Sequence, residues 1–146
     1  MHDYSITFAC YNSVEYTKQC VSSLVEAKTP MDRVVVVDNG SHDGTRDYLA
    51  DQSFGKVILN KANLGCGVAW NQGALEHQAD WTIVMNNDVL VTPQWAERLI
   101  DAAIHLNVKV VSPAMIEGPL DYDFQKFATK AEKRLAAIYR QGARHA

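Results

Sequence analysis

The fold is decided by residues 34–45, which read VVVVDNGSHDGT. Four consecutive valines without polar alternation predict a strand, Arg33–Asp38, that is buried on both faces as in the centre of a parallel sheet. The residues that follow are rich in Asn, Gly, Ser and Asp, which favour turns. Asp43 is placed to cap a short helix that runs through Leu49. A buried strand, a polar turn and a helix in this order are typical of an α/β protein.

The same alternation continues on both sides of this stretch. Thr92 is a good helix N-cap with Pro93 at the first helical position, and Thr29-Pro30 ends an earlier helix. The apolar spacing predicts helices over residues 14–28, 68–78 and 93–106, and strands at Ser5–Cys10, Lys56–Leu59, Trp81–Met85 and Val108–Ser112. We therefore expect a three-layer α/β/α sandwich with a mostly parallel sheet.

Composition is that of an ordinary globular domain. The chain has 146 residues, 47% of them hydrophobic, and a formal net charge of -3. Its mild acidity argues against broad binding of nucleic acid, which needs a basic surface. No apolar run reaches the roughly 20 residues that a membrane-spanning helix requires. The three cysteines, Cys10, Cys20 and Cys66, have no metal-ligand spacing, so we expect a reduced, cytoplasmic protein with Cys10 and Cys20 buried.

Polar side chains follow each of the first four predicted strands. In open α/β sheets, ligands bind beyond the carboxyl ends of the strands, so these side chains are the candidates for binding. Asp38 has two compatible roles: it can accept hydrogen bonds from a base or a ribose, and it can close a turn onto Ser41. The candidates are Tyr11 and Asn12, then Asp38, Asn39, Gly40 and Ser41, then Asn63 and Gly65, and finally Asn86, Asn87 and Asp88.

Two of these strand ends suggest more specific chemistry. Asn86 and Asp88 are two positions apart, so both side-chain oxygens can reach one hard cation such as Mg²⁺ or Mn²⁺. The alternative is an ordinary turn at the end of a strand. Gly65-Cys66-Gly67 is a weak phosphate-loop pattern, but its small residues would let backbone N–H groups approach a diphosphate at the start of the next helix. No cluster of histidines and cysteines suggests zinc.

Together these stretches resemble the family 2 glycosyltransferases, which have the GT-A fold. Three blocks carry the resemblance, and their order and spacing agree over about residues 5–115. Residues 6–12 resemble the opening strand and Tyr-Asn turn of the family. Residues 34–45 are very similar to its V-V-D-[DN]-G-S-x-D-G-T block, which is the specific one. Residues 63–71 and 86–88 resemble its N-x-G segment and its D-x-D metal motif, with Asn86 in place of the first acidic residue.

The resemblance implies a nucleotide-diphospho-sugar transferase-like domain over residues 1–115. In such a domain Asp38 would contact the base, and Asn63 and Gly65 would line the nucleoside and diphosphate. Asp88, with Asn86, would hold Mn²⁺ or Mg²⁺ between the phosphates. The donor site implied by the resemblance comprises Ala9, Tyr11, Asn12, Asp38, Asn39, Gly40, Ser41, Asn63, Gly65, Asn71 and Asn87. The activity implied is inverting transfer of a sugar from a nucleotide diphosphate to a glycan or lipid-linked hydroxyl, as in cell-wall or polysaccharide biosynthesis.

Residues 116–146 depart from the family pattern. Members continue into an acceptor-binding half with an acidic catalytic base, but no stretch here matches that half, so no catalytic base is assigned. Between residues 121 and 146 there are six Lys and Arg against three Asp and Glu, with apolar residues at helical spacing. We expect a loop and a basic amphipathic helix over residues 124–140, which packs on a protein surface or touches the inner face of a membrane. A module that binds the donor without transferring the sugar is the alternative function.

Overall fold

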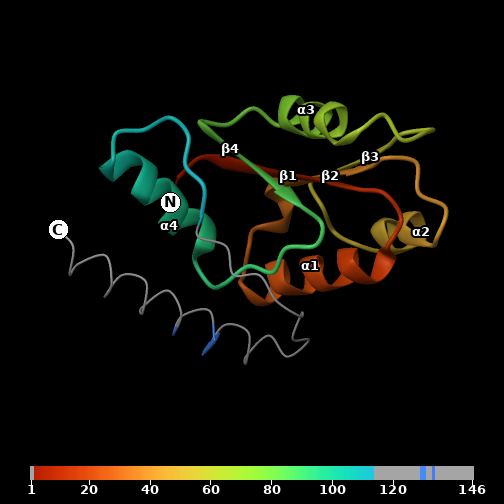
Figure 1. Ribbon diagram of the computed structural model, residues 1–146, viewed down its shortest axis with the longest axis horizontal. Coiled ribbons are helices and arrows are strands. Elements are labelled where there is room, and N and C mark those ends of the chain that lie inside the picture. The colour runs from red at the N-terminus through yellow and green to blue at the C-terminus, as the bar shows by residue number, and fades with distance from the viewer. Residues whose placement is uncertain (1, 114–128, 131–132, 134–146) are drawn as a thin grey trace.

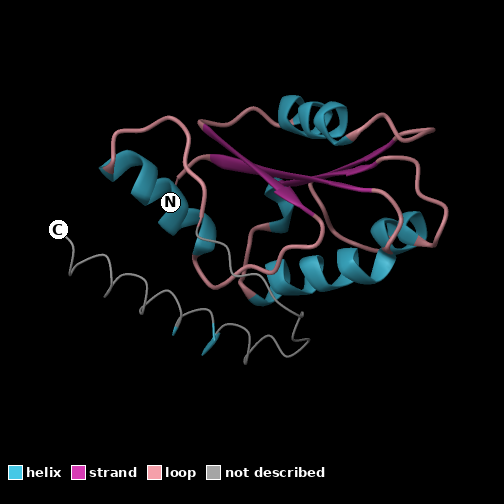
Figure 2. Cartoon of the chain, viewed as in Figure 1, coloured by secondary structure: helices cyan, strands magenta, loops and turns pink. Residues whose placement is uncertain are grey.

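The structure is a computed structural model that describes residues 2–113, 129–130 and 133. Strands and helices alternate along the described chain, as Figures 1 and 2 show. The strands are β1 (Tyr4–Cys10), β2 (Val34–Asp38), β3 (Lys56–Leu59) and β4 (Trp81–Asn86). The helices are α1 (Val14–Glu26), the 3-10 turn η1 (Met31–Arg33), α2 (Thr45–Ala50), α3 (Cys66–Glu76) and α4 (Trp95–His105).

All four strands are parallel and lie in the order β3-β2-β1-β4. In the register of the central pair, Ile6 lies opposite Val34 and Cys10 lies opposite Asp38. Helix α3 covers one face of the sheet, and α1, α2 and α4 lie on the other side (Figure 1). The predicted three-layer α/β/α architecture is therefore confirmed.

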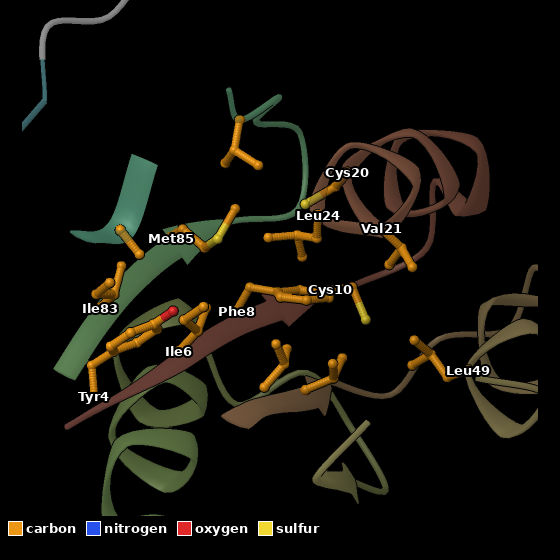
Figure 3. Close-up of a cluster of buried hydrophobic side chains, with 14 of the residues drawn as sticks. Tyr4, Ile6, Phe8, Cys10, Cys20, Val21, Leu24, Leu49, Ile83 and Met85 are labelled. Atoms are coloured by element: carbon orange, nitrogen blue, oxygen red, sulfur yellow. The ribbon is translucent and has the colours of Figure 1, made fainter. Parts of the chain in front are cut away.

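The main core lies between the sheet and α1. Alternate residues of β1, among them Ile6 and Phe8, point toward this side (Figure 3). They meet Leu24 of α1 in a cluster from which water is excluded, and the ring of Phe54 packs edge-on against Phe8 at 6.1 Å between centroids. All five residues of β2 are buried. The valine run thus occupies the interior position that its lack of alternation predicts.

The opposite face of β1 carries small side chains, so α3 approaches the sheet closely. Thr7 is fully buried there beneath Gly73 of α3. A Cβ at Gly73 would lie 1.8 Å from Thr7 Oγ1 and 3.3 Å from Val37 Cγ2. Such distances are far inside van der Waals contact. Gly73 therefore sets how close α3 lies to β1 and β2.

The predicted strand at Val108–Ser112 is wrong. The residues after α4 instead terminate that helix: Asn107 adopts a left-handed conformation, and the Val108 N–H donates to the Ala103 carbonyl at 3.0 Å. This arrangement satisfies helix-end carbonyls. Val110 is 87% exposed. A valine-rich pattern forms a strand only where a neighbouring strand accepts its backbone hydrogen bonds, and no described strand pairs with this segment.

One further local prediction needs correction. Thr92 does not cap α4, because Thr92 and Pro93 form a turn in which the Trp95 N–H donates to the Thr92 carbonyl at 3.2 Å. The helix therefore begins two residues later. Strand β4 is buried on one face only, since Val84 is 47% exposed. Most of the predicted tail helix lies outside the described residues, although residues 129, 130 and 133 are helical.

We predict that Gly73→Ala destabilises the protein by about 1–3 kcal/mol, because the added methyl group overpacks the contact with Thr7. Gly67→Ala in the same helix is the matched control, since a Cβ there meets nothing within 4 Å. That control is expected to be neutral or to stabilise by up to about 1 kcal/mol through better helix propensity. Urea unfolding of the three proteins measures the difference, and equal stability of the two variants would contradict the packing argument.

Candidate functional site at the carboxyl ends of the strands

The end of β2 places a carboxylate in the interior. Asp38 is fully buried, and both of its carboxylate oxygens accept the Ser41 N–H at 3.2 Å. The predicted turn onto Ser41 is thus confirmed. Gly40 between them has a φ of 90°, and a Cβ there would lie 2.8 Å from the backbone of Ala62. The turn therefore requires glycine both for its conformation and for the close approach of the next loop.

Arg46 of α2 neutralises the buried Asp38. Its Nε donates to Asp38 Oδ2 at 2.7 Å, and its Nη2 donates to the carbonyl of Asn60. A buried carboxylate is strongly unfavourable unless it is paired, so this ion pair is a condition for placing Asp38 in the interior. The guanidinium also links the ends of β2 and β3. No local pattern pointed to Arg46, because its partner Asp38 lies eight positions away across a turn.

The turn after β1 is fastened to the turn after β2. Asn12 and Ser13 both have left-handed backbones, with φ of 55° and 58°. The Asn12 N–H donates to Ser41 Oγ at 2.8 Å, and the His42 N–H donates to Asn12 Oδ1 at 2.8 Å. Two predicted site residues, Asn12 and Ser41, are therefore in direct contact. Their hydrogen bonds hold a turn conformation that non-glycine residues seldom adopt.

The side chain of Asp43 accepts hydrogen bonds at the start of two helices. Its Oδ2 accepts the N–H of Val14 at the start of α1 at 2.9 Å. Its Oδ1 accepts both the Thr45 N–H at 3.2 Å and the Thr45 hydroxyl at 2.6 Å at the start of α2. Desolvation raises the pKa of Asp43, but the hydrogen bonds from Thr45 and Val14 outweigh it, so the pKa is lowered overall. The N-cap residue of α2 is Gly44 rather than the predicted Asp43, and that of α1 is Ser13. Asp43 nevertheless accepts a backbone N–H at the start of both helices.

Asn39 organises the loop between β3 and α3. Its Nδ2 donates to Asn63 Oδ1 at 2.9 Å and to the Gly65 carbonyl at 3.3 Å. Its Oδ1 accepts the Leu64 N–H at 3.1 Å. Asn63 Oδ1 also accepts the Gly65 N–H at 2.9 Å. Three predicted site residues, Asn39, Asn63 and Gly65, thus form one network that positions the first turn of α3.

Asn60 and Gln72 complete this network, and neither is among the site residues predicted from the sequence. Asn60 Nδ2 donates to Gln72 Oε1 at 2.8 Å, while Gln72 Nε2 donates back to Asn60 Oδ1 at 3.1 Å. Asn60 also donates to Asn39 Oδ1 at 3.0 Å. Asn60 could have been predicted, because it directly follows β3. Asp38 and Asn39 were identified by the same kind of position, at the end of β2.

The end of β4 presents alternate side chains in different directions. Asn86 and Asp88 are exposed, whereas Asn87 Nδ2 turns inward and donates to Thr17 Oγ1 of α1 at 3.0 Å. Asn86 and Asp88 offer hard oxygen donors that suit Mn²⁺ or Mg²⁺. Among the described residues, no group of three or more His, Cys, Asp or Glu is arranged to hold a metal ion. An ion here would therefore need further oxygens from a ligand or from water.

The remaining predicted residues are less closely connected. Ala9 is half-buried near the end of β1, and Tyr11 is exposed beyond it. Asn71 lies on the exposed side of α3, outside the amide network. Across the described part of the chain, no helix is both long enough and apolar enough to cross a membrane.

Comparisons with known proteins agree with the geometry. A family model described as Glycosyl transferase family 2 matches residues 5–145, which extends about 30 residues beyond the resemblance found in the sequence. A curated relative, Glycosyltransferase AglE of Haloferax volcanii, is 24% identical over 135 residues. That match covers 88% of this chain and 43% of the relative.

Solved structures show the same fold. The mannosyltransferase PcManGT of Pyrobaculum calidifontis, in complex with GDP-Man and Mn²⁺, superposes with a TM-score of 0.60 at 20% identity, over 86% of this chain and 38% of that one. TarS 1-349 of S. aureus, in complex with UDP-GlcNAc, gives 0.58 at 24% identity, over 71% of this chain and 31% of that one. The chain therefore spans less than half the length of each of these proteins.

We predict that Asp43→Ala lowers the free energy of unfolding by about 1–2 kcal/mol at neutral pH, because two helices lose a capping acceptor. The folded-state pKa of Asp43 is lowered. Its contribution is thus complete at pH values above the ordinary Asp pKa of about 4 and disappears as the pH falls through the lowered value. Urea unfolding between pH 7 and pH 3 measures this effect, with Asp51→Ala, an exposed site at the end of α2, as the control. A difference that did not shrink at low pH would contradict the assignment.

We also predict that a thiol reagent at pH 8 modifies only Cys66 in the folded protein. Burial raises the pKa of both Cys10 and Cys20 to about 12, whereas Cys66 is exposed. The thiolate is the reactive form. Burial therefore protects Cys10 and Cys20 in two ways: it excludes the reagent, and it keeps both thiols protonated at pH 8. Counting modified thiols with and without denaturant is expected to give one and three, and rapid modification of Cys10 or Cys20 would contradict the described core.

Proposed function

Because the chain belongs to the family 2 glycosyltransferases, we propose that its described domain binds the nucleotide diphosphate of a sugar donor. The observation that carries this proposal is the convergence of polar groups from three neighbouring strand ends into one connected edge. Asn12 and Ser41 join the first two turns, and Asn39 joins the second to the loop that precedes α3. Ligands of parallel α/β sheets bind at this edge.

The two ends of the site suit different parts of the donor. The end of β2, where Asp38, Asn39, Gly40 and Ser41 lie, forms the nucleoside side together with Tyr11, Asn12 and Ala9. Gly65 and the first turn of α3 form the diphosphate side, because backbone N–H groups at a helix N-terminus favour anions. Asn63 holds Gly65 in place. Asn71 and Asn87 border this region.

A divalent cation fits the end of β4. Asp88 would hold Mn²⁺ or Mg²⁺ with Asn86 beside it, and the bound ion would supply positive charge opposite the diphosphate leaving group. PcManGT, which shares the fold, is in complex with GDP-Man and Mn²⁺. A single carboxylate at this position makes the cation depend on the phosphates for further ligands.

The complete reaction that we propose is transfer of the sugar to a hydroxyl of a glycan or a lipid-linked acceptor with inversion of the anomeric centre, as in the synthesis of cell-wall or other polysaccharides. The three cysteines are unpaired, which suits the reducing cytoplasm. Contact with the inner face of a membrane through residues 124–140 remains part of this proposal.

A second candidate is a module that binds the nucleotide sugar without transferring it. It is favoured because the described residues supply groups for the donor, and we assign none of them to the acceptor. The two candidates differ in one measurement: incubation of the chain with a bound nucleotide sugar and candidate acceptors gives a glycosylated product only for the transferase.

Calorimetric titration of this chain with UDP, GDP, dTDP and CDP, with and without Mn²⁺, tests the donor site. We expect one nucleotide to bind more tightly than the others and to require the metal. Asp88→Ala is expected to abolish the metal dependence and to weaken binding at least about tenfold, which corresponds to about 1.4 kcal/mol. Asp80→Ala, an exposed carboxylate at the opposite end of β4, is the matched control and is expected to bind as the unchanged chain does. Undiminished metal-dependent binding by Asp88→Ala would contradict the metal assignment.

A further inference from the structure

A row of short polar side chains on α1 holds the chain that leaves β4. Thr17, Cys20 and Ser23 follow one another at intervals of three residues, so they are neighbours on one side of the helix. All three side chains are buried. Each of them has a hydrogen-bonding partner between residues 86 and 91. The helix therefore contacts this connection through directed hydrogen bonds as well as through apolar packing.

Two members of the row hold residues 86–88, which we call the metal loop. Asn87 Nδ2 donates to Thr17 Oγ1 at 3.0 Å. The Cys20 thiol lies 3.9 Å from the Asn86 carbonyl, a long and weak hydrogen bond of the kind that sulfur makes. Figure 3 shows the Cys20 side chain pointing from α1 toward the chain that leaves β4. The stronger of the two contacts is therefore the one that Thr17 makes.

The third member of the row holds a segment beyond the metal loop. Ser23 Oγ accepts the Val91 N–H at 3.2 Å and donates to the Cys20 carbonyl at 2.7 Å. Val91 is itself buried, and it precedes the turn that leads into α4. Thr17 and Ser23 thus make similarly buried hydrogen bonds to the same connection, but only the bond of Thr17 is made to the metal loop.

The contact with Thr17 matters because the two proposed metal ligands have no side-chain support of their own. Asn86 and Asp88 are exposed. Among the described residues, neither side chain is hydrogen-bonded to another protein group. The direction of their oxygens therefore follows from the backbone of the metal loop, which α1 holds at Asn87, the residue between them.

We infer that Thr17 is a positioning residue for the divalent cation, on which it acts through Asn87. Groups that orient the ligands of a metal ion tune its affinity although they do not coordinate it. The Thr17 hydroxyl keeps the Asn87 amide turned toward α1, so the loop presents Asn86 and Asp88 together at the edge of the sheet. The inference rests on the proposed donor site. It assigns Asn87 to the support of the cation rather than to contact with the nucleotide.

The test compares Thr17→Val with Thr17→Ser and Ser23→Ala. Valine is β-branched like threonine but has no hydroxyl, so it fills the space and removes the acceptor for Asn87. Serine keeps the hydroxyl and is the conservative variant that restores the contact. Ser23→Ala is the matched control, because it removes another buried hydrogen bond between α1 and the same connection. Urea unfolding confirms that each variant is folded and ranks the stabilities.

The unchanged chain is first titrated with UDP, GDP, dTDP and CDP to find the nucleotide that binds most tightly. Calorimetric titrations with that nucleotide at increasing Mn²⁺ then give the Mn²⁺ concentration for half-maximal binding. Thr17→Val is expected to raise this concentration about tenfold, the effect typical of losing a group that orients a metal ligand. Excess Mn²⁺ is expected to restore its Kd for the nucleotide. Thr17→Ser and Ser23→Ala are expected to need no more Mn²⁺ than the unchanged chain.

A second variant tests the same hydrogen bond from its other end. Asn87→Ala removes the donor, and it serves if Thr17→Val does not fold. It is expected to raise the Mn²⁺ requirement as Thr17→Val does. Because both changes remove one shared interaction, the double variant is expected to need no more Mn²⁺ than either single variant.

Three results would overturn the inference. An unchanged Mn²⁺ requirement in Thr17→Val and in Asn87→Ala would mean that their hydrogen bond does not position the loop. An equal increase in Ser23→Ala would make the general stability of this connection the cause. Weaker binding that excess Mn²⁺ does not restore would place Asn87 on the nucleotide.

Two results with the unchanged chain separate this inference from the proposed function. Binding of a nucleotide that does not depend on Mn²⁺ would leave the donor site in place and remove the metal assignment together with the role of Thr17. Failure to bind any of the four nucleotides would remove the proposed function itself, and the inference with it.

Discussion

The polar edge of this domain depends on one buried charge. Asp38 ends the most buried strand of the sheet, and its carboxylate has no contact with solvent. Such a group is tolerated only when its oxygens are paired, so the turn to Ser41 and the side chain of Arg46 must both be in place. That requirement fixes the start of α2, and through the Asn60 carbonyl it also ties the end of β3 to the same point.

The other turns and loops at this edge are held by side-chain hydrogen bonds rather than by regular secondary structure. Ser41 and His42 hold the turn after β1, Asp43 accepts backbone N–H groups at the start of α1 and α2, and Asn39 holds the loop before α3. Backbone groups in loops need partners as much as those in strands do. Because short polar side chains supply these partners, the edge is preorganised for a ligand without an additional layer of structure. Preorganised donors and acceptors lower the cost of ordering on binding.

The two sides of the sheet are built by different means. On the side of α1, large apolar residues such as Phe8 and Leu24 fill the space. On the other side, Thr7 and Gly73 permit α3 to approach the sheet closely. The position of α3 depends on the lack of a side chain at Gly73. This close packing sets the height of α3 above the sheet, and hence the position of Gly65 at its first turn relative to Asn39 and Asn63. Packing on one face therefore contributes directly to the geometry of the proposed diphosphate side.

The sequence by itself determined the alternating elements, the buried valine strand, the turn of Asp38 onto Ser41 and the family. Each of these follows from local signals, namely periodicity, turn residues and a contiguous motif. Only the tertiary structure decided the roles of Arg46, Asn60 and Gln72, the inward turn of Asn87, and the fate of Val108–Ser112, which lacks a described partner strand. The physical reason is that side-chain pairing, burial and strand formation depend on groups that are distant in the chain. A local sequence pattern does not indicate which distant groups come into contact in the folded protein.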